Sequence, residues 1–186
     1  MIVGVLALQG AFQKHADALK SLNCSYRFVK KPSDLEGLRG LILPGGESTV
    51  MSCLLRENNL FDSILNFSHK HSLFGTCAGI ILMAKKVNSE KVLNFGLLDI
   101  EIQRNAYGYQ VDSFDHEVFI NFLNEPITVP FIRAPKIEKI LSPDVKVLGN
   151  LKGVPVLIKE GLHMAATFHP ELTSNLSIHR YFLDSL

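Results

Sequence analysis

The sequence has few cysteines and no pattern that would use them structurally. It holds three, Cys24, Cys53 and Cys77, an odd number with wide spacing. A disulfide framework needs a denser, even set, and a structural zinc site would show a Cys-x-x-Cys pair, which is absent. We therefore expect reduced thiols, a cytoplasmic location and no structural metal.

Features that mark nucleic-acid or membrane partners are also scarce. The formal net charge is only +1, from 19 basic and 18 acidic side chains. The basic residues are scattered, so no nucleic-acid surface or polybasic membrane patch is indicated. No apolar run reaches the length of a membrane span. The start of the chain, Met-Ile-Val-Gly, lacks the basic segment and cleavage site of a secretion signal and is better interpreted as a first strand.

Repeats, low-complexity tracts and linkers are missing too. Hydrophobic residues make up 47% of the chain, which is typical of a folded globular protein. A length of 186 residues suits one domain with a substantial core. We therefore predict a single domain over residues 1–186. Neither nucleotide-binding glycine pattern occurs, so no phosphate-binding loop is indicated.

Apolar runs alternate with amphipathic stretches in the first half, and strands dominate the second half. The expected strands are 2–8, 25–29, 40–43, 72–75, 98–103, 118–122, 128–132, 145–148, 154–158 and 164–168. Helices are expected after the first strand, from about 48 to 70 with a break near Asn58-Asn59, and at the C-terminus. The alternation predicts an α/β fold with an open, mostly parallel sheet and helices on both faces. Ligands bind outside the carboxyl ends of the strands in such sheets.

A cysteine lies at the tip of a sharp turn between an expected strand and an expected helix. Residues 75–79 read Gly-Thr-Cys-Ala-Gly, the cysteine counterpart of the Gly-x-Ser-x-Gly nucleophile elbow. The two glycines are needed because the tight turn leaves no room for a Cβ. We expect the turn to push the Cys77 side chain into the open at a helix N-terminus, where the thiolate nucleophile is favoured. The alternative is a buried core cysteine.

Seven histidines offer a base for this nucleophile, and His169 stands out because it ends an expected strand. If Pro170 keeps the following segment extended, His169 and Glu171 project to the same side. An imidazole oriented by a carboxylate is the arrangement of a catalytic triad. The alternative is a helix N-cap region with an incidental histidine. His15, expected on the polar side of a helix, and His179, on the last helix, are interpreted as solvated or structural.

Residues 44–49 read Pro-Gly-Gly-Glu-Ser-Thr and lie between an expected strand and an expected helix. Adjacent glycines at Gly45 and Gly46 admit backbone conformations closed to other residues. Their N–H groups, together with that of Ala78, would then line an oxyanion hole. The alternative is an ordinary turn in which Ser48 or Thr49 caps the helix.

Seven segments resemble the class I, triad-type glutamine amidotransferases, and within them the glutaminase subunits of two-component pyridoxal phosphate synthases. They are residues 4–10, 43–49, 74–79, 103–108, 111–114, 131–135 and 168–172. The elbow and the His-x-Glu pair are common to the wider superfamily. The Gly-Gly-Glu-Ser-Thr, Arg-Asn-Ala-Tyr-Gly and Ile-Arg-Ala-Pro segments point to the narrower family. One departure is Tyr109, where the family usually has a basic residue.

The resemblance implies a flavodoxin-like, class I glutamine amidotransferase fold that hydrolyses L-glutamine to L-glutamate and ammonia. Cys77 would be the nucleophile, His169 the base and Glu171 the residue that orients the base, with Gly46 and Ala78 in the oxyanion hole. The residues implied to line the glutamine site are Gly46, Glu47, Ser48, Arg104, Ile132 and Arg133. An arginine or backbone N–H groups suit the α-carboxylate of glutamine, and a carboxylate such as that of Glu47 suits its α-ammonium.

The resemblance also implies a partner, the synthase subunit that uses the ammonia to make pyridoxal 5′-phosphate, in a heteromeric complex. No metal and no organic cofactor are expected on this chain. Because free ammonia is lost to solvent, we expect the free chain to be weakly active and Gly45-Gly46 to rearrange on docking. The expected docking face is the N-terminal segment with the loops around Gln9-Gly10 and residues 45–49.

Two other functions remain open from the sequence. One is a different amide or peptide hydrolase that uses the same elbow, such as a γ-glutamyl hydrolase or an intracellular protease, since fold alone does not settle function. The other is a regulatory binding subunit that keeps the fold without catalysis. The presence of Cys77, His169 and Glu171 together argues against the regulatory subunit.

Overall fold

The structure, a computed structural model, describes residues 1–104 and 113–186. Its helices are α1 (Phe12–Ser21), α2 (Ser48–Glu57), α3 (Phe61–Ser68), α4 (Ala78–Met83) and α5 (Ser177–Asp184), with 3-10 turns η1 (Pro32–Leu35) and η2 (Pro170–Leu172). Its strands are β1 (Ile2–Leu6), β2 (Ser25–Val29), β3 (Gly40–Leu43), β4 (Ser72–Thr76), β5 (Ala84–Val87), β6 (Leu98–Gln103), β7 (Ser113–Ile120), β8 (Ile127–Ile132), β9 (Lys136–Ile140), β10 (Lys146–Leu151), β11 (Val154–Glu160) and β12 (His163–Ala166).

A nine-stranded sheet in the order β2-β1-β3-β4-β12-β11-β10-β7-β8 forms the centre of the molecule. The strands from β2 to β12 pair in parallel. This is the 2-1-3-4-5 order of flavodoxin-like sheets, with β12 as the fifth strand. From β12 onward each pairing is antiparallel. The parallel half therefore carries an antiparallel extension, and a small second sheet, β5-β6-β9, lies beside it.

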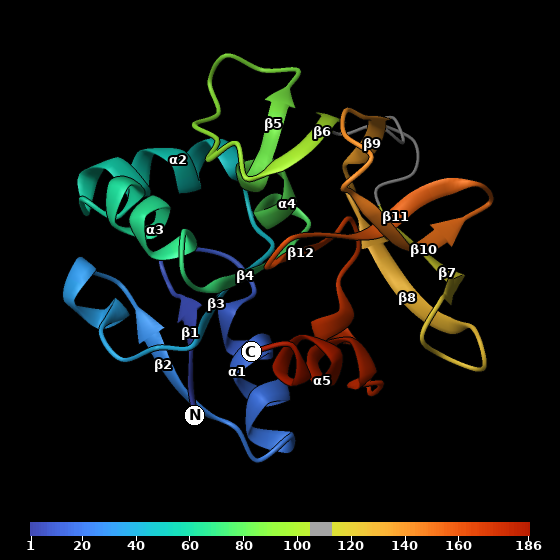
Figure 1. Cartoon of the computed structure of the whole chain (residues 1–186), viewed down its shortest axis with the longest axis horizontal. Coiled ribbons are helices and arrows are strands. Elements are labelled where there is room, and N and C mark those ends of the chain that lie inside the picture. Colours follow the sequence, from blue (N-terminus) through green and yellow to red (C-terminus); the bar gives the residue numbers. More distant parts are fainter. Residues whose placement is uncertain (105–112) are drawn as a thin grey trace.

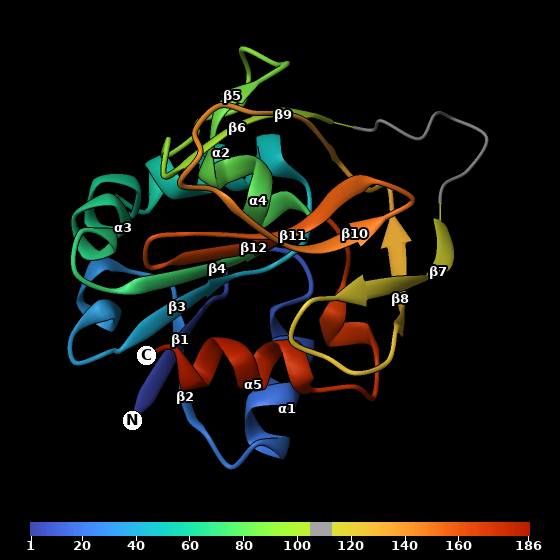
Figure 2. The same ribbon diagram turned by 45° about the vertical axis from the view of Figure 1, so that its right-hand side comes forward.

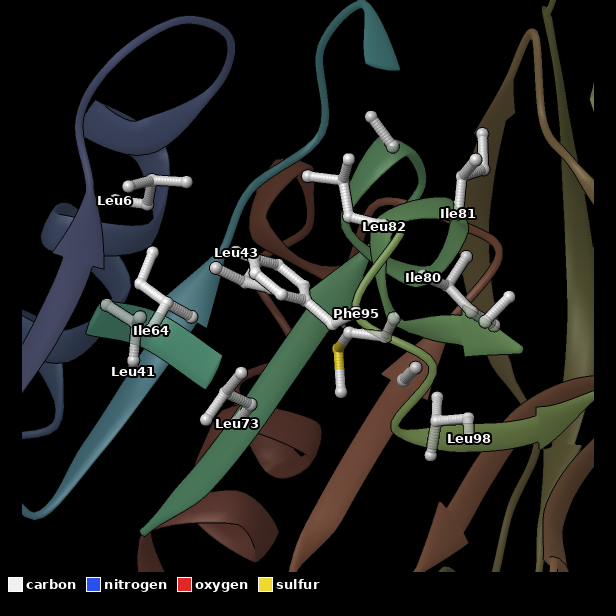
Figure 3. Packing of buried hydrophobic residues seen from close by; sticks show 14 of the residues in the cluster. Leu6, Leu41, Leu43, Ile64, Leu73, Ile80, Ile81, Leu82, Phe95 and Leu98 are labelled. Carbon is white, nitrogen blue, oxygen red and sulfur yellow. The ribbon is translucent and has the colours of Figure 1, made fainter. Parts of the chain in front are cut away.

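Helices cover both faces of the large sheet, as predicted. Helices α2, α3 and α4 lie on one side together with the small sheet, whereas α1 and α5 lie on the other (Figures 1 and 2). Each face is apolar and packs its own cluster of buried side chains. In the first cluster Leu43 and Leu73 of the sheet meet Leu82 of α4 and Phe95 of the loop that follows β5 (Figure 3). Burial of this apolar surface supplies the main driving force for folding.

Element positions follow the sequence prediction closely in the first half and less closely in the second. The break at Asn58-Asn59 separates α2 from α3, and the strand predicted at 98–103 is β6. The strand predicted at 118–122 is instead the end of the longer β7. Strands β5 and β9 were not predicted. In the part of the chain that the structure describes, no helix is long and apolar enough to cross a membrane.

Strand order decides where the candidate site lies. Strands β1, β3, β4 and β12 are neighbours and run in parallel, so their carboxyl ends meet at one edge of the sheet. The segments that follow them contain Gln9, Gly45, Cys77 and His169 in turn. The topology thus brings together residues that lie as much as 160 positions apart in the chain, since 169 − 9 = 160.

Candidate active site

Cys77 occupies a strained turn between β4 and α4. Its backbone has φ 49° and ψ −102°, a left-handed conformation that non-glycine residues rarely adopt, and its N–H donates to Ala166 O at 2.9 Å. A Cβ on Gly79 would lie 2.1 Å from Leu43 O, and one on Gly75 would lie 2.6 Å from Met83 Sδ. Both glycines are therefore required by close packing, and the segment has the backbone of a nucleophile elbow.

The Cys77 side chain is not in the open, contrary to the prediction from the turn. The residue is only 6% exposed, and its thiol donates to Ile132 O, at the end of β8, at 3.7 Å. A Cβ on Gly45 would lie 3.3 Å from Cys77 Cβ, so the Gly-Gly segment also packs close to it.

His169 and Glu171 meet beside Cys77. The Nδ1 atom of His169 lies 2.7 Å from Oε1 of Glu171, and both residues are buried. The backbone between them is not extended, as the sequence reasoning assumed, because Pro170 opens the 3-10 turn η2. The fixed φ of proline suits the first position of a helical turn. The His169 N–H is also held by Pro130 O of β8 at 3.0 Å.

Electrostatics favour a charged imidazole at this position. Burial alone would lower the pKa of His169, but hydrogen bonds to Cys77 and Glu171, with their charges, raise it to about 10. Because Nδ1 faces Glu171, Nε2 is the ring nitrogen left to interact with Cys77. Burial would raise the pKa of the Glu171 carboxyl, but His15 and His169 lower it overall. Cys77, His169 and Glu171 therefore lie together at this edge, with the Glu171 carboxylate bonded to a ring whose charged form is favoured.

The Gly-Gly segment packs tightly against the loop that follows β1. The Gly45 carbonyl oxygen accepts from Ala11 N at 3.0 Å, and a Cβ on Gly46 would lie 2.3 Å from Gln9 Oε1. Neither glycine has a positive φ, so close packing, rather than an unusual backbone conformation, is what favours glycine here. The Gly45 bond fixes the peptide that carries the Gly46 N–H.

Glu47 and Arg104 form an ion pair above the start of α2. Oxygen Oε1 of Glu47 lies 2.9 Å from Nη2 of Arg104. Glu47, rather than Ser48 or Thr49, is the N-cap residue, since its carboxylate accepts from Thr49 N at 3.1 Å and Val50 N at 2.7 Å. Burial would raise the pKa of this carboxyl, but these backbone bonds and Arg104 lower it overall.

The remaining predicted site residues lie at the same edge. Ser48 is 2% exposed, and its hydroxyl has no hydrogen-bond partner among the residues that the structure describes. Ile132 is partly exposed at the end of β8, and Arg133 follows it with a positive φ of 44°. Tyr109 lies outside the described residues. Within the described ranges, no group of three or more His, Cys, Asp or Glu side chains could hold a metal ion.

Two histidines set aside on sequence grounds lie directly behind Glu171. His15, predicted on a polar helix face, is fully buried, and so is His179. The spacing of His15 to Ala18 and Leu19 places it on the buried stripe of α1, which is the signal that the sequence reasoning missed. The Nε2 atom of His15 lies 3.4 Å from Oε2 of Glu171.

Comparison with known proteins agrees with this geometry. Residues 5–186 match the model of the SNO glutamine amidotransferase family. A pyridoxal 5′-phosphate synthase subunit PdxT from Oenococcus oeni is 47% identical over 181 residues, 97% of this chain and 94% of the relative. The corresponding subunit from Thermotoga neapolitana is 44% identical over 99% of this chain and 98% of the relative.

Solved structures extend the comparison to the fold. One described as a glutamine amidotransferase superposes with a TM-score of 0.93 at 42% identity, covering 100% of this chain and 98% of that one. PurLQS from Thermotoga maritima superposes at 0.72 with 15% identity, covering 98% of this chain and 97% of that one; it shares the fold alone. With the family model spanning nearly the whole sequence, the chain belongs to the SNO glutamine amidotransferase family.

Proposed function

We propose that this chain hydrolyses L-glutamine to L-glutamate and ammonia and passes the ammonia to a synthase partner that makes pyridoxal 5′-phosphate. The observation that supports it most is that the Cys77 elbow and the His169–Glu171 pair both pack against Gly45, in a member of a glutamine amidotransferase family. The partner is inferred from relatives named as subunits of pyridoxal 5′-phosphate synthase.

The first half of the reaction forms a thioester. The Cys77 thiolate attacks the side-chain amide carbon of glutamine, and the N–H groups of Ala78 and Gly46 hold the resulting oxyanion. As the carbon–nitrogen bond breaks, Nε2 of the His169 imidazolium gives its proton to the departing ammonia. The raised pKa of His169 suits this role because the imidazole is protonated when the nucleophile is a thiolate.

The second half regenerates the enzyme. The now neutral His169 takes a proton from water, and the hydroxide attacks the γ-glutamyl thioester to release glutamate and the thiolate. Glu171 keeps Nδ1 protonated throughout, so that Nε2 is always the nitrogen that faces the reaction.

The Glu47–Arg104 pair offers complementary charges for a zwitterionic amino acid. Glu47 would take the α-ammonium of glutamine, while Arg104 and Arg133 would take its carboxylate. Glutamine binding would therefore replace the Glu47–Arg104 ion pair by two others, one between Glu47 and the ammonium and one between Arg104 and the carboxylate. The buried Ser48 hydroxyl adds a polar group beside them.

The test measures glutamate release from free glutamine with a purified pyridoxal phosphate synthase subunit present. We expect activity in the wild type and in the Cys53→Ala control, whose thiol is exposed, and none in Cys77→Ala. Turnover that survives in Cys77→Ala would overturn the mechanism. A strong preference for a peptide or a polyglutamylated compound over glutamine would favour the other hydrolase activities instead.

A further inference from the structure

A buried pair of histidines connects two helices behind the triad. Nδ1 of His15, on α1, lies 3.0 Å from Nε2 of His179, on α5. Both rings are fully buried and pack edge-on against Phe74 of β4, at centroid distances of 6.3 and 5.9 Å. Burying polar side chains in an apolar core costs folding free energy unless they are hydrogen-bonded. We therefore asked what this buried pair does for the neighbouring triad.

The hydrogen bonds determine which ring nitrogens carry protons. Burial lowers the pKa of both rings, that of His179 to about 3, so both are neutral. Nδ1 of His179 has no hydrogen-bond partner among the described residues, and a bare nitrogen tolerates this better than an N–H. His179 therefore donates from Nε2 to Nδ1 of His15, which leaves the Nε2–H of His15 as a donor.

That donor bonds to the Thr76 hydroxyl and lies close to the far side of the triad carboxylate. Nε2 of His15 lies 3.1 Å from the Thr76 hydroxyl and 3.4 Å from Oε2 of Glu171. Oε2 has no hydrogen-bond partner among the described residues, so its 3.4 Å separation from His15 Nε2 is an electrostatic contact, whereas Oε1 is held by His169 at 2.7 Å. A buried carboxylate that is held at one oxygen only would be free to turn about its Cγ–Cδ bond.

We propose that His15 is a positioning residue of the triad, whose Nε2–H attracts the nearby Glu171 Oε2 electrostatically and so keeps Oε1 aimed at His169. His179 fixes the tautomer of His15, and the hydroxyl of Thr76, within the elbow, accepts the hydrogen bond from His15 Nε2–H. The inference rests on the proposed function for its kinetic consequence. The series of contacts from His179 on α5, through His15 on α1, to Glu171 does not depend on which substrate the enzyme uses.

The test compares His15→Leu, His15→Gln, His179→Leu and the double leucine variant with a matched control, His163→Leu. His163 is also partly buried and accepts one backbone hydrogen bond, from Leu73 N at 3.3 Å, but it lies at the opposite end of β12 from the triad. Two readouts are used. The first is kcat and KM for glutamine with the synthase subunit present. The second is the pH dependence of Cys77 alkylation by iodoacetamide in a Cys24→Ser, Cys53→Ser background.

We expect His15→Leu to lower kcat by about 10- to 100-fold with little change in KM, because orientation is lost while substrate contacts remain. Alkylation near neutral pH should slow, since a poorly oriented Glu171 supports the imidazolium less. His15→Gln retains a donor near the Nε2 position, so it should recover part of the lost kcat and part of the lost alkylation rate. The double variant should be no worse than His15→Leu, because both residues act through one chain.

The proposal would be overturned if His15→Leu and His179→Leu had the same kcat and the same alkylation profile as His163→Leu. If His15→Leu does not fold, unchanged values in His15→Gln and His179→Leu overturn it equally. If even the wild type fails to hydrolyse glutamine, the proposed function fails, while the alkylation profiles still decide whether His15 positions the triad.

Discussion

The charge on His169 depends on two neighbouring side chains. Its pKa of about 10 lies above the ordinary value of 6.5, because Cys77 and Glu171 outweigh the cost of burial. Folding therefore favours the protonated ring. The stability that this provides is complete below pH 6.5 and is lost as the pH rises through 10.

Replacing Cys77 by alanine removes one of the two supports of the imidazolium. We predict that the pKa of His169 falls in Cys77→Ala, and that less stability is lost between pH 6.5 and 10 than in the wild type. A ring-proton NMR titration of His169 measures the first effect, and chemical denaturation at several pH values measures the second. Cys53→Ala is the control, and an unchanged His169 titration in Cys77→Ala would contradict the assignment.

Single residues were predictable where a motif fixes the backbone. Gly75, Cys77 and Gly79 sit in the expected turn because their spacing encodes local geometry. The burial of Cys77 and the partners of His15 were not predictable, because both depend on what α5, β8 and η2 bring from far along the chain. A histidine on a helix gives no sign from sequence that its partner is another histidine 164 residues away.

The junction between β4 and α4 depends on a close approach of backbone to backbone. A Cβ added at Gly79 would lie 2.1 Å from Leu43 O, which cannot move without disturbing β3. We predict that Gly79→Ala lowers the free energy of unfolding by about 3 kcal/mol. Gly37→Ala, with φ +73° but nothing within 4 Å, tests backbone strain alone and should cost about 1 kcal/mol. Equal losses, measured by denaturant unfolding, would count against the packing explanation.

The start of α2 is stabilised by a side chain that also belongs to the candidate glutamine site. Glu47 accepts hydrogen bonds from Thr49 N and Val50 N, so Glu47→Ala should destabilise the protein by about 1 kcal/mol. The same change should raise KM for glutamine, because it removes the proposed partner of the ammonium group. Glu57→Ala, at the exposed end of α2, is the control: it should leave KM unchanged and should not destabilise the protein, because the helix dipole does not favour an acidic side chain at a C-terminus.

Elements with a continuous apolar run or a clear helical stripe were predicted from the sequence, and the small exposed ones were not. Strand β5, Ala-Lys-Lys-Val, follows α4 without a turn signal, and two of its residues are exposed. Strand β9 begins after Pro135 and ends in three exposed residues. Their pairing with β6 is tertiary, so local sequence carries little trace of it.

The whole molecule gathers the ends of four parallel strands at one edge of the sheet, and this edge is where we expect the synthase partner to act. The Gly45 carbonyl is held by Ala11 N, so turning the Gly46 N–H would break a bond to the loop after β1. Docking against that loop would therefore couple partner binding to the oxyanion hole.

Gly46→Val tests this coupling. Its Cβ would meet Gln9 Oε1, the end of a flexible side chain, so the fold should persist while the segment stiffens. We predict that glutaminase activity stimulated by the synthase subunit is lost, with thermal stability close to that of the wild type. The comparison also needs the wild-type rate with and without the synthase. Equal rates there would refute the gating proposal while leaving the triad intact.

The central claim is that Cys77 cleaves the side-chain amide bond of glutamine through a covalent thioester. Rapid-quench mass spectrometry tests this claim most directly. The wild-type chain, mixed with the synthase subunit in the presence of glutamine and then quenched in acid, should carry one γ-glutamyl group on the peptide that contains Cys77. His169→Asn lacks both the acid for ammonia release and the base for hydrolysis. In this variant the γ-glutamyl group should therefore form more slowly and be removed more slowly than in the wild type. Glutamate release with no trace of the adduct on Cys77, or an adduct on Cys24 or Cys53 instead, would contradict the account.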